Sequence, residues 1–176
     1  MKRFGSQIAI ITGGTRGIGH ECASRLGQEG ALVYLFDINP RDKTQKEADT
    51  KNKLTLRDVV VDVTNEKAVS NAVSHIIKEH GRIDILVNSA GITGKTGVAS
   101  DKAELRDVQN VMNVNFFGTF ICCKSVLPQM VKQNYGRIIN IASISGKEGN
   151  PGQLAYASSK GKLKKKLKFF FKDFFL

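Results

Sequence analysis

Three residues near the end of the chain, Ser143, Tyr156 and Lys160, have side chains that together could deliver a proton to a carbonyl oxygen. Tyr156 and Lys160 are four positions apart, so on a helix they share one face and the ammonium sits beside the phenol. A free tyrosine has a pKa of roughly 10, and acid–base work near neutral pH requires it to fall by about three units, or roughly 4 kcal/mol. One cation about 4 Å away supplies roughly that energy at an effective dielectric constant of about 20. Ser143 would hold the substrate oxygen, and a separate hydride donor would complete the reduction.

A tyrosine four residues before a lysine is also typical of a solvated pair on an exposed helix, so a second signal is needed. Residues 7–12 form a short apolar, β-branched run of the kind expected for a buried parallel strand. A glycine-rich turn follows, in which Gly13, Gly17 and Gly19 lead into a helical pattern. Such a turn lets a pyrophosphate approach backbone N–H groups at the positive end of the helix. The spacing differs from the common G-x-G-x-x-G pattern. The alternative to a pyrophosphate site is a glycine turn that only separates the strand from the helix.

A second strand, residues 31–36, ends in Asp37, eighteen residues after Gly19, where an acid would meet the adenosine ribose. A carboxylate there accepts hydrogen bonds from the 2′ and 3′ hydroxyls and repels a 2′-phosphate, which favours NAD over NADP. Arg16 in the glycine turn indicates the opposite, because it can pair with a 2′-phosphate, unless it contacts only the pyrophosphate or solvent. We therefore expect NAD as the cofactor, with NADP as the alternative.

The glycine turn, the acid and the Ser/Tyr/Lys set stand in the order found in short-chain dehydrogenases/reductases, and residues 5–161 closely resemble that family. The resemblance implies an NAD(P)-dependent oxidoreductase that transfers hydride between nicotinamide and a carbonyl or secondary alcohol. Tyr156 would donate the proton on reduction and accept it on oxidation. Asn115 matches the helix asparagine that binds a water linking the active-site lysine to solvent; a local helix hydrogen bond is its alternative. The implied catalytic residues are Asn115, Ser143, Tyr156 and Lys160.

Two further family landmarks follow the third and fourth predicted strands. Asp62 and Val63 resemble the pair that frames adenine, and residues 88–91 resemble the family's Asn-Asn-Ala-Gly element, with Ser89 as a small polar departure. The resemblance implies no metal site. The implied cofactor-binding residues are Gly13, Thr15, Arg16, Gly17, Ile18, Gly19, Asp37, Asp62, Val63, Asn88, Ala90, Gly91, Tyr156 and Lys160.

Strand and helix patterns alternate along the chain, which predicts an α/β fold: a Rossmann-like, doubly wound parallel sheet with helices on both faces. Ligand contacts should gather at the carboxyl ends of the strands. Residues 39–53 are polar without a clear apolar face, so we expect a short surface helix or a mobile loop there. Strands are expected near 7–12, 31–36, 56–62, 83–88 and 136–141, and helices near 17–28, 65–80, 103–133 and from 154 onward.

Composition fits a cytoplasmic enzyme with one sizeable core. The 176 residues are 41% hydrophobic, which suggests a single domain. The three cysteines form neither a disulfide framework nor a metal-ligand spacing, and the three histidines are scattered. The first apolar run enters the glycine turn directly, so we expect no cleavable signal peptide, and no segment is expected to be long enough to span a bilayer.

The sequence changes character after Gly161, so we expect an incomplete dinucleotide-binding domain over residues 1–161 and a Lys/Phe-rich tail over 162–176. The tail holds six lysines and one aspartate and carries +5 of the net charge of +11. A frameshift or truncated gene is the leading interpretation, since family members continue with two further strands and the helices that cover the substrate. A basic amphipathic helix on an anionic membrane is the second, and nonspecific nucleic-acid binding is less favoured.

The general pattern resembles 3-oxoacyl-carrier-protein reductases. Residues 143–151 also resemble members that oxidise sugar-derived acids with NAD, and Asp37 fits that branch better. An inactive, truncated dinucleotide-binding remnant is the alternative of a different class. Family members commonly form homo-tetramers, which is less expected of an incomplete subunit. The expected partner is a small-molecule carbonyl or alcohol, with no specific nucleic acid and no membrane contact.

Overall fold

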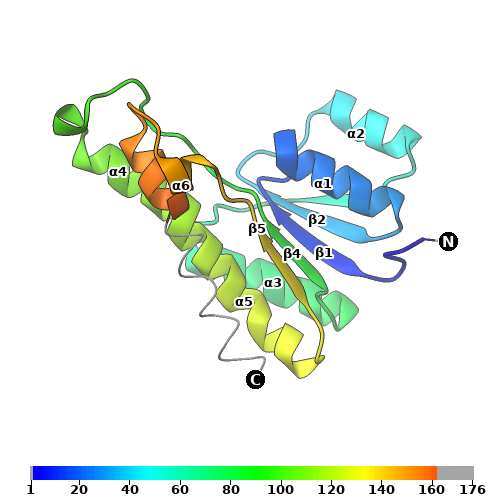
Figure 1. The fold of residues 1–176 in the computed structure, drawn as a ribbon. Coiled ribbons are helices and arrows are strands. Elements are labelled where there is room, and N and C mark those ends of the chain that lie inside the picture. Colours follow the sequence, from blue (N-terminus) through cyan, green and yellow to red (C-terminus); the bar gives the residue numbers. More distant parts are fainter. Residues whose placement is uncertain (1, 162–176) are drawn as a thin grey trace.

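The computed structural model describes residues 2–161, which form a five-stranded parallel sheet with helices on both faces (Figure 1). The strand order is β3-β2-β1-β4-β5, so the chain starts at the centre of the sheet and builds outward on both sides. This arrangement confirms the predicted Rossmann-like α/β fold. The strand bounds differ from the predicted ones by no more than two residues: β1 Ile8–Thr12, β2 Leu32–Asp37, β3 Leu56–Val60, β4 Ile85–Asn88 and β5 Arg137–Asn140.

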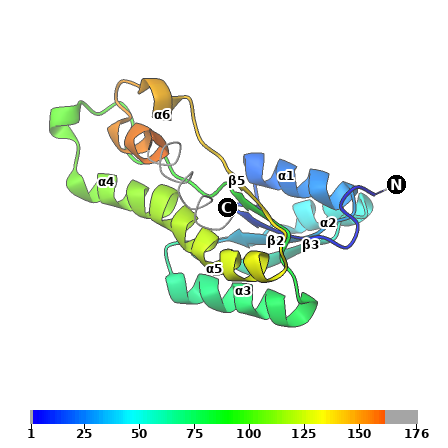
Figure 2. The ribbon, with the colours of Figure 1, turned by 60° about the horizontal axis from the view of Figure 1, so that its bottom comes forward.

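Alternate side chains of each strand supply two separate cores, one on each face of the sheet. Ile10 of β1 faces the core that α3 (Glu66–His80) and α5 (Thr119–Lys132) cover. Its neighbour Ile11 faces the opposite core, which α1 (Gly17–Gln28) covers (Figure 2). Because both faces of β1 are buried, the strand is apolar at every position except its last, Thr12.

One long helix lies on the α3 side of the sheet and carries Asn115. The sequence predicts a single helix over 103–133, and the chain is helical from Leu105 to Lys132. Its first part is α4 (Leu105–Met112), and its middle part is a π-helical segment, η2 (Asn113–Gly118), that no sequence pattern indicates. A π-helical turn is wider than an α-helical one and is found frequently at functional sites. Here it contains Asn115.

The expectation that no segment is long enough to span a bilayer is wrong on length and composition alone. The helix from Leu105 to Lys132 has 28 residues, and its most apolar stretch has a mean hydropathy of 1.2. However, 44% of that stretch is buried, and α5 packs against α3. The core helix of a soluble protein meets the same criteria, so the match is weak evidence for a membrane span.

The polar segment 39–53 contains a helix, α2 (Lys43–Lys51), which is the first of the two alternatives considered for it. A capping box starts this helix. The Asp42 carboxylate accepts a hydrogen bond from Gln45 N–H at 2.8 Å, and Gln45 Oε1 accepts one from Asp42 N–H at 3.0 Å. The only buried residue of α2 is Asp49, so its contact with the rest of the protein is polar.

The remaining helices are short or lie near the end of the described chain. Residues 154–161 are helical, as predicted. A 3₁₀ turn, η1 (Ser100–Lys102), and a four-residue helix, α6 (Ser145–Glu148), are too short to produce a periodic pattern, and the sequence does not predict them. The Lys/Phe-rich tail, including its possible amphipathic helix, lies outside the described residues.

Gly118→Ala tests how tightly the long helix packs against the loop after β3. A Cβ on Gly118 would lie 2.6 Å from Val63 Cγ2, and this overpacking should lower the free energy of unfolding by about 1–3 kcal/mol in urea titrations. Val63→Ala removes the opposing methyl group, so the double variant should recover much of the loss. Gly5→Ala, where the nearest atom would be 3.7 Å away, is the control. A Gly118→Ala protein as stable as the control would show that the contact gives way freely.

Candidate active site

A cavity of about 500 Å³ lies at the carboxyl ends of the strands, where the sequence predicts the ligand contacts. Residues that follow or end all five strands line it, and they include both the glycine turn and the Tyr/Lys pair. The sheet therefore brings together residues that are far apart in the sequence. The predicted site residues that line the cavity are Gly13, Arg16, Gly17, Ile18, Asp37, Asp62, Val63, Ala90, Gly91, Tyr156 and Lys160.

The glycine turn is locked to the end of β4 by backbone contacts that only glycine permits. Gly13 has a φ of 61°, and a Cβ there would lie 2.9 Å from the Cα of Ala90. Thr12 Oγ1 accepts hydrogen bonds from the N–H groups of Ser89 at 3.1 Å and Ala90 at 3.0 Å. A Cβ on Gly19 would overlap the carbonyl of Gly13. The first turn of helix α1 therefore packs closely against the glycine turn.

The start of α1 offers a place for an anion. No side chain among the described residues caps the helix, and no acidic residue stands in its first turn. Arg16, Gly17 and Ile18 line the cavity at this point. Uncapped N–H groups at a helix amino terminus attract negative charge, so the residues present fit a pyrophosphate.

Asp37 is fixed in orientation by the glycine turn. Its Oδ2 accepts hydrogen bonds from Thr15 Oγ1 at 2.8 Å and from the Thr15 N–H at 3.4 Å, while Oδ1 accepts one from Asn39 N–H at 3.2 Å. Thr15, one of the predicted site residues, is buried, and it holds the Asp37 carboxylate from outside the cavity lining. Arg16, the next residue after Thr15, is exposed and lines the cavity.

Lys160 is a buried cation anchored to the residue that follows β5. Only 4% of the residue is exposed, and Nζ donates a hydrogen bond to the Ile141 carbonyl at 2.7 Å. Nζ lies 5.8 Å from the centroid of the Tyr156 ring, so the two side chains are neighbours in space. The effect of the cation on the phenol stays a prediction. Burial lowers the pKa of Lys160 below its ordinary value.

Asn115 joins three segments through one buried amide. Its Oδ1 accepts a hydrogen bond from Ile92 N–H at 2.8 Å, and its Nδ2 donates to the Ile92 carbonyl and to Ser159 Oγ, both at 2.9 Å. Ser159 Oγ donates in turn to the Tyr156 carbonyl at 2.8 Å. A Cβ on Gly91 would lie 3.2 Å from Asn115 Oδ1 and 3.6 Å from Lys160 Nζ, so Asn115 and Lys160 both approach this glycine. A water-binding role for Asn115 stays a prediction.

Five predicted residues do not line the cavity: Thr15, Gly19, Asn88, Asn115 and Ser143. Asn88 is buried, and its Nδ2 donates to Asn140 Oδ1 at 2.8 Å and contacts Cys123 Sγ at 3.4 Å, which ties β4 to β5. Ser143 follows β5, is half-buried, and accepts a hydrogen bond from Ser145 N–H at 3.2 Å. Thr15 and Gly19 are both buried.

Sequence reasoning missed the residues that act through backbone groups. Ile92 and Ile141 offer main-chain atoms to Asn115 and Lys160, and their side chains give no sign of this role. Ser159 had a usable signal, because it lies one position before Lys160 and three after Tyr156 on the same helix. The further lining residues are Phe36, Ile38, Val61, Ser89, Ile92, Thr93, Val114 and Ile141.

Cysteine or metal chemistry has little support in the part of the chain that the structure describes. Burial raises the pKa of Cys122 to about 12 and that of Cys123 to about 11, so both thiols stay protonated. Between residues 2 and 161, no cluster of three or more His, Cys, Asp or Glu side chains could hold a metal ion.

Comparison with known proteins places this geometry among dehydrogenases and reductases. The family profile described as short chain dehydrogenase matches residues 7–169. The enzyme 2-dehydro-3-deoxy-L-rhamnonate dehydrogenase (NAD(+)) of Sphingomonas sp. (strain SKA58) is 40% identical over 160 residues, which cover 90% of this chain and 62% of that protein. The 3-oxoacyl-[acyl-carrier-protein] reductase of Thermotoga maritima is 38% identical over 161 residues, or 90% of this chain and 64% of that protein.

A solved structure agrees with the sequence relatives. NAD+-bound xylitol dehydrogenase matches with a TM-score of 0.84 and 35% identity, covering 92% of this chain and 62% of that one. The chain thus spans less than two thirds of the length of each of these relatives. The family match covers nearly all of the described residues, and the chain belongs to the short-chain dehydrogenase family.

Proposed function

We propose that this chain binds NAD along the cavity and supports hydride transfer between the nicotinamide and a carbonyl or secondary alcohol. The observation that carries the proposal is that a single cavity of about 500 Å³ is lined by Asp37, by the start of α1, and by Tyr156 and Lys160. The volume is ordinary for a cofactor site. The groups suited to ribose, pyrophosphate and proton transfer therefore share one space.

The cofactor end of the site is built from Asp37 and the glycine turn. Asp37 accepts hydrogen bonds from the adenosine ribose hydroxyls and repels a 2′-phosphate, while Thr15 keeps its carboxylate in place. The preference for NAD over NADP follows from this carboxylate. When bound, the nicotinamide ring supplies the hydride for reduction or accepts it on oxidation.

Tyr156 moves the proton. On reduction, the phenol O–H bond breaks and the proton passes to the substrate oxygen, and on oxidation the phenolate takes a proton from the alcohol. Lys160 keeps a positive charge beside the ring, and the Ile141 carbonyl holds the ammonium in position. The family resemblance assigns the substrate oxygen to Ser143, which lies outside the cavity lining in this structure. Asn115 positions the segment that carries Tyr156 and Lys160 through Ser159.

We propose two alternative substrate classes. Similarity to the Thermotoga maritima enzyme favours 3-oxoacyl groups on a carrier protein. Asp37 and the similarity to the NAD(+)-named rhamnonate dehydrogenase favour a sugar-derived acid. An inactive dinucleotide-binding remnant is the alternative of a different class. We further propose that the protein is cytoplasmic and that any assembly is a homo-oligomer.

Cofactor preference is testable by thermal unfolding of the full-length protein with NAD or NADP. A ligand that binds only the folded state raises the midpoint, and NAD should raise it more than NADP. Asp37→Asn removes the negative charge, so it should shrink the NAD shift and enlarge the NADP shift. Asp101→Asn, an exposed change on η1, is the control and should match wild type. No shift with either cofactor would rule out cofactor binding by this chain.

Tyr156→Phe should lower kcat by about 10²- to 10⁴-fold without reducing the NAD-induced thermal shift, because only the proton donor is lost. Turnover is measured on a panel of 3-oxoacyl thioesters and sugar-derived acids. Tyr135→Phe is the matched control, since its hydroxyl contacts Gln7 outside the cavity. Unchanged turnover in Tyr156→Phe would refute the assignment, and NAD binding without turnover in wild type would favour the remnant.

The buried Lys160 should make stability depend on pH. Its pKa is lowered in the folded state, so between that pKa and the ordinary value of 10.5 the unfolded chain binds more protons. The free energy of unfolding of wild type, minus that of Lys160→Met, should therefore increase as pH rises through this window. Urea unfolding at several pH values measures the difference. Lys43→Met, whose lysine side chain is 91% exposed, is the control. A pH-independent difference would mean that Lys160 titrates as a solvated lysine.

A further inference from the structure

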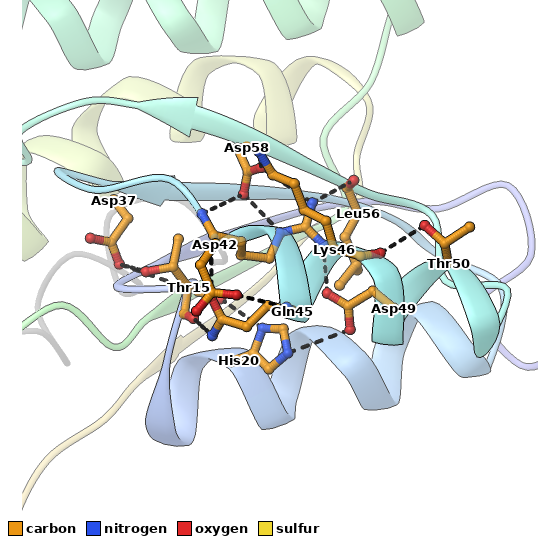
Figure 3. A network of polar contacts seen from close by, with 12 residues as sticks. Thr15, His20, Asp37, Asp42, Gln45, Lys46, Asp49, Thr50, Leu56 and Asp58 are labelled. Atoms are coloured by element: carbon orange, nitrogen blue, oxygen red, sulfur yellow. Dashed lines mark hydrogen bonds and ion pairs between the residues drawn. The ribbon is translucent and has the colours of Figure 1, made fainter.

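The contact between α2 and the rest of the protein is a polar network next to the glycine turn (Figure 3). At its centre is Arg41, which is only 7% exposed. Its guanidinium donates to Asp49 Oδ2 at 2.6 Å, to Asp58 Oδ1 at 2.8 Å and to the Leu56 carbonyl at 3.0 Å. A buried charge requires such partners, so the network fixes α2 against β3.

Two side chains carry this network to the glycine turn. His20 Nε2 lies 3.5 Å from Asp49 Oδ1, and its Nδ1 lies 3.3 Å from the Gly14 carbonyl. Gln45 Nε2 donates a hydrogen bond to the Thr15 carbonyl at 2.9 Å. The same Gln45 amide uses Oε1 to complete the capping box of α2. One side chain thus joins the start of α2 to the turn.

Thr15 is the link between Gln45 and the cavity. Its carbonyl accepts the hydrogen bond from Gln45, while its hydroxyl and N–H donate to Asp37 Oδ2. Gln45 does not line the cavity itself. The hydrogen-bonded path from Gln45 to a bound ribose therefore runs through Thr15 and the Asp37 carboxylate.

We propose that Gln45 is a positioning residue that sets the preference for a ribose 2′-hydroxyl over a 2′-phosphate. It does so by holding Thr15, which in turn orients the Asp37 carboxylate toward the ribose. This inference rests on the proposed binding of NAD. It assigns part of the cofactor preference to a residue of α2 that touches no cofactor.

The chemistry of the amide allows its two roles to be separated. Glutamate is a normal partner in a capping box, so Gln45→Glu keeps the acceptor for Asp42 N–H. A carboxylate has no hydrogen to donate, so the bond to the Thr15 carbonyl is lost. Thr44→Glu adds the same charge one position away on an exposed residue, and it leaves both Gln45 bonds in place.

The experiment is to measure Kd values for NAD and NADP by calorimetry on full-length wild type, Gln45→Glu and Thr44→Glu. Relative to Thr44→Glu, Gln45→Glu should raise the Kd for NAD about fivefold, the effect of one hydrogen bond. The Kd for NADP should rise less, because Asp37 makes no favourable contact with a 2′-phosphate. The ratio of the NADP Kd to the NAD Kd should therefore fall about threefold.

The outcomes are distinguishable. Gln45→Met, which removes both bonds without adding charge, should lower the ratio as well, and its unfolding midpoint reports the separate loss of the cap. If both Gln45 variants weaken NAD and NADP equally, or leave both unchanged, Gln45 only supports α2 and the inference is overturned. If wild type binds neither cofactor, the proposed function fails and the inference falls with it. A changed ratio with an unchanged midpoint in Gln45→Glu supports the positioning role.

Discussion

The buried amide of Asn115 is the interaction on which the arrangement of the site depends. In the interior, an amide group with unmet hydrogen bonds is costly, and Asn115 meets its needs with the backbone of Ile92 and the hydroxyl of Ser159. Those partners belong to the segment after β4 and to the helix of residues 154–161. Satisfying one side chain therefore fixes the long helix, the wall of the cavity and the Tyr156–Lys160 pair relative to one another.

A second polar system serves the other part of the cavity in the same way. The network of Arg41, Asp49 and Asp58 joins α2 to β3, and Gln45 and Thr15 connect α2 to Asp37 by hydrogen bonds. Both systems place hydrogen-bonded polar groups, most of them buried, outside the cavity lining. The groups proposed to meet the ligands are thus held by side chains that the ligands never touch.

The sequence was sufficient for the sheet, the major helices and most of the cavity lining. Strand β1 is buried on both faces, so its apolar run is unambiguous, and parallel strands bring their carboxyl ends to one edge of the sheet. Gly13, Asp37 and Gly91 could be placed there because each follows or ends a strand. The roles of these residues stay predictions, since their positions in space do not test what they bind.

The supporting contacts were beyond sequence reasoning for two physical reasons. The partners of Asn115, Lys160 and Gln45 include main-chain carbonyls. Every residue carries such a carbonyl, so the sequence does not indicate which ones accept these hydrogen bonds. Segment 39–53 lacked an apolar face because α2 docks through charge, so hydrophobic periodicity could not orient it.

The strand order also has a consequence for synthesis of the protein. Strands β1 to β3 are adjacent in the sheet and are complete by Val60, whereas β5 and Ser159 leave the ribosome roughly 80 to 100 residues later. The glycine turn and Asp37 can therefore take their places on the nascent chain before Tyr156 exists. The half of the sheet that would meet adenosine is therefore synthesised first, and the residues proposed to move the proton are synthesised last among the described residues.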